Sequence, residues 1–175
     1  SKKVAGMIVS LGFGAQPAAL IGAGNLALDI PVAVDANSLW RVYSMTKPIT
    51  GMAVMQRVAT GELKLDQPIA DIMPEFRAMR VLIDPAKGLE SREAARPITV
   101  RHLLTHTAGF SYTVAGNGPL EKEYKRLGIQ PGSVPAFLQP GDGALPDLQV
   151  MALALAGLPL VLDPGTAWKY SISLD

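Results

Sequence analysis

The chain has 175 residues, of which 49% are hydrophobic and 18% charged, so it can bury a core of one domain or somewhat more. Its formal net charge is +1 and its basic residues are scattered, which excludes the basic stripe of a nucleic-acid-binding protein. It contains no cysteine, which excludes disulfides and thiolate metal sites and leaves the cellular compartment open. The most apolar window, residues 148–162, includes Gln149 and Pro159 and is too short to span a bilayer.

Two apolar, glycine-rich runs come first, at residues 4–13 and 18–28. The turn residues between them predict two antiparallel strands, and because both strands are apolar on both faces we expect the sheet to be covered on each side. The second run contains Gly22-Ala23-Gly24-Asn25-Leu26-Ala27, which matches the dinucleotide-binding pattern Gly-x-Gly-x-x-Gly/Ala. That pattern binds a nucleotide only where it opens a helix, and Pro31 in a β-branched setting favours a strand instead.

A serine and a lysine three residues apart follow, in Ser44-Met45-Thr46-Lys47, at the start of an apolar helix that we expect to stop at Gly61. Residues three apart share a helix face, so the pair would set a nucleophile beside a base. The lysine can act as a base if burial lowers its pKa, and the apolar flanks predict burial. Free N–H groups at this helix start could stabilise an oxyanion. The alternative is a serine cap with a solvated lysine.

The middle of the chain contains both histidines. We expect a short helix from Ile69 to before Pro74, a surface loop over residues 84–97, and a helix over residues 98–109 that is capped by Thr99. His102 and His106 would then lie on one helix face, which raises the question of zinc. Leu103 stands where a metalloprotease carries its glutamate, and no third ligand is evident, so packing or hydrogen-bonding histidines are favoured over a metal site.

Residues 111–145 are rich in glycine and proline around one charged helix over residues 120–127. Such a stretch can form a lid or pocket wall, or it can simply pack on the surface. A helix is expected from Pro146, with Leu148, Met151, Ala152 and Leu155 on one stripe, followed by a turn over residues 163–166.

Four separated stretches together resemble the serine β-lactamase-like family, which includes class C β-lactamases, D-Ala-D-Ala carboxypeptidases and family VIII carboxylesterases. They are Ser44-Met45-Thr46-Lys47, residues 63–74, residues 98–109, and Pro164-Gly165-Thr166-x-Trp168-x-Tyr170-Ser171. The resemblance implies an α/β (α+β) fold of the β-lactamase/transpeptidase type, with an antiparallel sheet flanked by helices and a mostly helical subdomain. Residues 1–62 would begin the α/β domain, residues 63–162 would form the subdomain, and residues 163–175 would return with the tyrosine.

The same resemblance implies roles for three residues and needs no cofactor. Ser44 resembles the acyl-accepting nucleophile, Lys47 its proton-transfer partner, and Tyr170 the tyrosine that shares the acid and base work. The β-lactamase form of that last motif is Tyr-x-Asn, and Ile172 here cannot make the hydrogen bond of the amide to the antibiotic. A carboxylic ester is therefore the favoured substrate. A β-lactamase or D-amino-acid peptidase, and a binding or sensor protein without turnover, remain alternatives.

A third family motif, carried by a C-terminal strand that supplies an oxyanion donor, is not found after Tyr170. Without those strands the sheet would keep unpaired edges and an open core. We therefore expect a companion chain or segment that carries the C-terminal half of the protein, and we expect hydrolysis of a small-molecule ester only in its presence.

Overall fold

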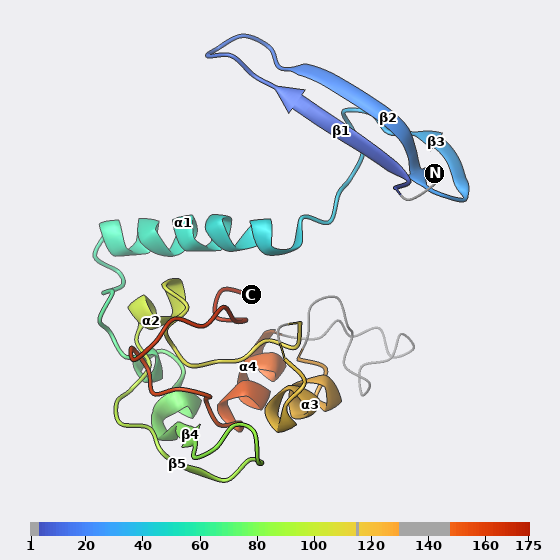
Figure 1. The fold of residues 1–175 in the computed structure, drawn as a ribbon. Helices are drawn as coiled ribbons and strands as arrows, with labels where there is room; N and C mark the ends of the chain where they lie inside the picture. Colours follow the sequence, from blue (N-terminus) through green and yellow to red (C-terminus); the bar gives the residue numbers. More distant parts are fainter. Residues whose placement is uncertain (1–3, 115, 130–147) are drawn as a thin grey trace. The chain divides into compact units, whose positions relative to one another are not determined.

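The computed structural model describes residues 4–114, 116–129 and 148–175, and the chain forms two compact units, Ser1–Val42 and Tyr43–Asp175 (Figure 1). The division of the chain at residues 62 and 162 that the sequence suggested stays a prediction. The first unit is all β, and the second carries the helices and every residue named above as catalytic.

The first unit is an antiparallel sheet of three strands in the order β1 (Gly6–Leu11), β2 (Ala19–Ala27) and β3 (Ile30–Ala33). Gly6 pairs with Gly24 at one end of the β1–β2 ladder, and Leu11 pairs with Ala19 at the other. The predicted pair of strands and its turn are therefore present, and the apolar run after the turn continues into a third strand.

Gly24 explains why the second run resembles a nucleotide-binding pattern. It lies inside β2, where its φ is +82°, and a Cβ at this position would overlap the carbonyl oxygen of Ala5. Glycine is needed here because the two strands approach closely in a left-handed conformation. No helix starts at this pattern, so it does not form a dinucleotide site.

Large apolar side chains on this sheet are exposed within its own unit, although we expected both faces to be covered. Val34 is buried, whereas Met7, Ile21 and Val32 have exposed fractions of 56%, 61% and 51%. The strands thus have the apolar residues on both faces that a buried sheet needs, but no segment within residues 4–42 packs over those faces.

The second unit begins with a 3₁₀ turn, Tyr43–Met45, that leads directly into α1 (Thr46–Ala59). The helix ends as predicted: the backbone N–H of Thr60 donates to the carbonyl of Gln56, and Gly61 follows in the left-handed region with φ +78°. This helix carries Lys47 in its first turn.

Short elements follow α1, and they pack around a common core (Figure 1). They are the 3₁₀ helices Ile69–Asp71 and Pro74–Ala78, the strands β4 (Arg80–Leu82) and β5 (Ser91–Glu93), and the helices α2 (Val100–Leu104), α3 (Pro119–Arg126) and α4 (Leu148–Ala156). The expected surface loop over residues 84–97 is wrong in part, because β5 pairs with β4 inside it. The core takes its apolar side chains from these elements, from the connections between them and from the last segment, among them Phe76, Val81, Ile98, Phe110, Leu120, Leu160 and Ile172.

None of the helices in the described ranges is long and apolar enough to cross a membrane.

Candidate active site

Ser44 and Lys47 lie at the start of α1, as the sequence predicted. Ser44 is exposed in the 3₁₀ turn, and Lys47 is buried with an exposed fraction of 4%. Both residues line one hollow of about 380 Å³, together with Pro48, His106 and Tyr170 among others. The alternative of a serine cap with a solvated lysine is therefore wrong, because Lys47 is buried and Met45 takes the N-cap position.

The ammonium group of Lys47 has a partner that the sequence analysis did not name. Its Nζ donates to Oδ1 of Asp175 at 2.5 Å. Burial lowers the pKa of Lys47, but the hydrogen bond and the negative charge of Asp175 outweigh it, and the net effect is a raised pKa. The expectation of a lowered pKa is thus wrong, because burial came with a carboxylate.

Two tyrosines, rather than one, flank Lys47. Its Nζ lies 5.4 Å from the ring centroid of Tyr112 and 5.4 Å from that of Tyr170. The two rings meet edge to face, with centroids 5.4 Å apart. Burial raises the pKa of Tyr112, while the charge of Lys47 and, more weakly, the hydroxyl of Ser44 act against that rise. Sequence reasoning missed Tyr112 because it lies in the irregular stretch after Gly109, where no periodic pattern places a side chain.

Ser44 stands between two hollows. The first, described above, carries Tyr170, and the second, of about 220 Å³, carries Tyr112 and Asp175. Leu174 lines both. Ser44 therefore shares one hollow with the phenol of Tyr170 and the other with the phenol of Tyr112.

The histidines do not share a helix face, because α2 ends before His106. Thr99 and His102 form a capping box: Thr99 Oγ1 accepts from the backbone N–H of His102, and His102 Nδ1 accepts from the backbone N–H of Thr99. His106 has φ +54° and packs on Tyr170, with ring centroids 4.7 Å apart. Burial lowers the pKa of both rings.

The search for a metal site in the described part of the chain finds no cluster of three or more histidine, cysteine, aspartate or glutamate side chains that could hold an ion.

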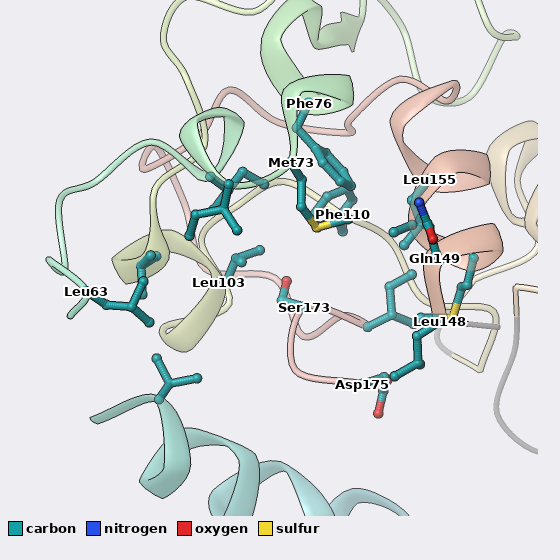
Figure 2. Close-up of a pocket in the computed structure, with 17 residues that line it drawn as sticks. Leu63, Met73, Phe76, Leu103, Phe110, Leu148, Gln149, Leu155, Ser173 and Asp175 are labelled. Atoms are coloured by element: carbon teal, nitrogen blue, oxygen red, sulfur yellow. The ribbon is translucent and has the colours of Figure 1, made fainter. Parts of the chain in front are cut away.

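Ile172 belongs to the buried core, and its exposed fraction is 6%. It lines an apolar cavity of about 490 Å³ that also reaches Asp175. In Figure 2, Met73, Phe76 and Phe110 lie close together across this cavity from the α4 residues Leu148 and Leu155. The residue in the third place of the tyrosine motif is thus part of the core.

Comparison with known proteins identifies the family of this chain. The model of the Beta-lactamase family matches residues 1–173. Esterase EstB from Burkholderia gladioli is 39% identical over 140 residues, which are 79% of this chain and 30% of that protein. Acyltransferase calJ from Penicillium decumbens is 35% identical over 136 residues, which are 77% of this chain and 29% of that protein.

A solved structure supports the same fold. EstCE1, described as a hydrolase with promiscuous acyltransferase activity, superposes with a TM-score of 0.67 at 26% identity, over 96% of this chain and 38% of that chain. The chain spans about a third of the length of the curated relatives it matches. The fold expected from the sequence, of the β-lactamase/transpeptidase type, is confirmed. With a family model matched along nearly its whole length, the chain belongs to the Beta-lactamase family.

Proposed function

We propose that this chain carries the nucleophile of a serine hydrolase that cleaves carboxylic esters through an acyl-enzyme on Ser44. The observation that carries the proposal is the position of Lys47, which is buried one turn after Ser44 and lies 5.4 Å from the rings of both Tyr112 and Tyr170. A serine becomes a useful nucleophile only where groups that exchange protons surround it, and this site has one amine and two phenols.

In the proposed reaction Ser44 Oγ attacks the ester carbonyl, and its proton passes to the group formed by Lys47 and Tyr170. The tetrahedral oxyanion is stabilised by the backbone N–H of Ser44 at the start of α1 and by one donor from a companion segment. The alcohol then leaves with a proton from the same group, and an acyl-enzyme remains. Water attacks the acyl-enzyme, gives its proton to that group and releases the carboxylic acid, which restores Ser44.

Two observations favour an ester over a β-lactam. Ile172, which stands where the antibiotic-binding asparagine would be, is buried in the core and offers no hydrogen bond to a substrate amide. Among the relatives, EstB is named an esterase.

The test compares the turnover of p-nitrophenyl butyrate and of a cephalosporin by the intact protein. We expect ester turnover to be the faster of the two and the Ser44→Ala variant to lose about a thousandfold or more in kcat. Ser10→Ala, which changes an exposed serine on β1, is the matched control and should leave turnover unchanged. Faster cephalosporin turnover would point to an amide-directed enzyme. A single stoichiometric burst would point to a binding or sensor protein.

A second activity, acyl transfer to an alcohol, is suggested by the relative named an acyltransferase. The acyl-enzyme would be the same, and an alcohol would replace water as the second nucleophile. Adding a primary alcohol to the p-nitrophenyl butyrate assay should then yield its butyrate ester as well as butyric acid. Butyric acid alone, at all alcohol concentrations, would restrict the reaction to hydrolysis.

We further propose that a companion segment, equivalent to the remaining part of the relatives, covers the apolar surfaces of this chain. Ile49, Met52 and Met55 on α1 have exposed fractions of 65%, 67% and 45%. Exposed apolar surface of this extent marks an interaction site.

Native mass spectrometry of the purified protein tests this second proposal. We expect the sequence of the remaining part of the relatives to be present, in a bound chain or in the same chain. Where it is a separate chain, Met52→Asp should weaken the complex, and Lys64→Asp should not. A monomer of this chain that turns over ester by itself would contradict the proposal.

A further inference from the structure

We propose that Asp175 is a positioning residue for acyl transfer, and that its carboxylate holds the Lys47 side chain as an ammonium group beside Ser44. This inference rests on the proposed ester hydrolysis and assigns a role to a residue outside the three that the family resemblance implied. Asp175 does not touch the reacting atoms, so it acts through Lys47.

The contact has the geometry of a strong, charge-assisted hydrogen bond. Lys47 Nζ and Asp175 Oδ1 are 2.5 Å apart, and Lys47 is 4% exposed. A buried ammonium without a counter-charge is costly, so a carboxylate at this distance fixes both the position and the charge of the side chain. The side chain of Asp175 is itself 34% exposed, so substituting it leaves no large void.

The other groups that face Lys47 are two phenols and one imidazole. Tyr112 and Tyr170 approach it with their rings, and His106, whose pKa is lowered by burial and then by the charge of Lys47, is neutral near pH 7. Asp175 therefore supplies the negative charge in this group, and its effect on the pKa of Lys47 is to raise it against burial.

The consequence is a reaction that depends on pH. A lysine can accept the proton of Ser44 only after it has lost its own, so the raised pKa of Lys47 predicts that activity increases as the pH becomes alkaline. Removing the carboxylate leaves burial as the dominant influence, and burial lowers the pKa of a lysine. The neutral amine should then form at lower pH.

The experiment compares the pH profiles of kcat/KM on p-nitrophenyl butyrate for the intact protein and its Asp175→Asn variant. Asparagine keeps the size of the side chain and removes the charge, so we expect the rising limb of the profile to shift to lower pH. Asp66→Asn breaks an exposed ion pair with Arg101 elsewhere in the second unit, and this control should leave the limb in place. A limb that does not move in Asp175→Asn overturns the inference, whether or not the rate falls.

Two further measurements keep the test decisive. If Asp175→Asn does not fold, Asp175→Glu takes its place: it keeps the charge, so the limb should stay while kcat falls because Nζ is displaced. A limb that moves in Asp175→Glu also overturns the inference.

Labelling of Ser44 by a fluorophosphonate separates the two proposals. Labelling with an unmoved limb refutes only the role of Asp175, whereas a protein that is never labelled refutes the ester hydrolysis on which it rests.

Discussion

At the scale of single residues, Lys47 is the buried side chain around which the site is assembled. Asp175 and Tyr112 were not predicted as its neighbours, because they come from segments 128 and 65 residues away in the chain, and only the tertiary fold brings them together. The Lys47 pKa is raised because of that distant carboxylate, whereas burial alone predicted that it would be lowered.

Tyr112 provides a prediction about Ser44, the proposed nucleophile. Both residues line one hollow, and Ser44 lowers the pKa of the Tyr112 phenol. If the phenol orients Ser44 through a hydrogen bond, Tyr112→Phe should slow fluorophosphonate labelling of Ser44 about tenfold. Circular dichroism of the variant should match the wild type, because the ring remains to pack on Tyr170. An unchanged labelling rate would mean that Tyr112 has no part in orienting Ser44.

Asp163 provides a prediction about stability and pH. Its carboxylate accepts hydrogen bonds from Arg92 and from the backbone N–H of Ala95, and these contacts lower its pKa from 3.8 to about 2. A carboxylate whose pKa is lowered in the folded state stabilises the fold at every pH above its ordinary pKa of 3.8. This stabilisation is lost as the pH falls from 3.8 through about 2. Because Arg92 is half exposed, Asp163→Asn should cost only about 1 kcal/mol at pH 7.

Urea unfolding at pH 7 and at pH 2.5 measures this difference. The difference in the free energy of unfolding between wild type and Asp163→Asn should be smaller at pH 2.5 than at pH 7. Asp84→Asn, which affects an exposed pair with Lys87, should change stability less at pH 7. A gap of equal size at both values of pH would show that the charge of Asp163 is not its source.

At the scale of elements, the helix boundaries followed the cap and stop residues in the sequence. Gly61 ends α1 and Thr99 caps α2, both as predicted. The length of α2 was wrong, because it ends at Leu104 and His106 turns into the left-handed region. His106 is held there by contacts with Ser171 and Tyr170 near the other end of the unit, and the sequence around the helix could not indicate them.

Two glycines that both have positive φ give a matched comparison at this scale. Gly61 has φ +78° in open space, so Gly61→Ala should cost about 1 kcal/mol of backbone strain. Gly109 has φ +91°, and a Cβ there would overlap the carbonyl oxygen of Leu162, so Gly109→Ala should cost about 3 kcal/mol or more. The free energies of unfolding of the two variants test this order. Equal losses would mean that the packing of Gly109 against the segment after α4 adds nothing.

At the scale of the whole molecule, the sequence predicted the family fold, because spaced motifs identify a fold even where local patterns are weak. It also predicted that Ser44, Lys47 and Tyr170 come together, and they line one hollow. It also predicted a sheet buried on both faces, and residues 4–42 leave those faces exposed. An apolar pattern predicts that a surface is buried, but it does not predict which segment packs against that surface. The companion segment proposed above would supply that cover.

The most direct test of the account is intact mass spectrometry of the purified protein before and after treatment with a fluorophosphonate, under denaturing conditions that separate any bound chain. We predict that this chain gains the mass of one probe, that the adduct maps to Ser44, and that Ser44→Ala gains none. A chain that stays unlabelled although its companion segment is present, or an adduct on another residue, would contradict the assignment of Ser44 as the nucleophile.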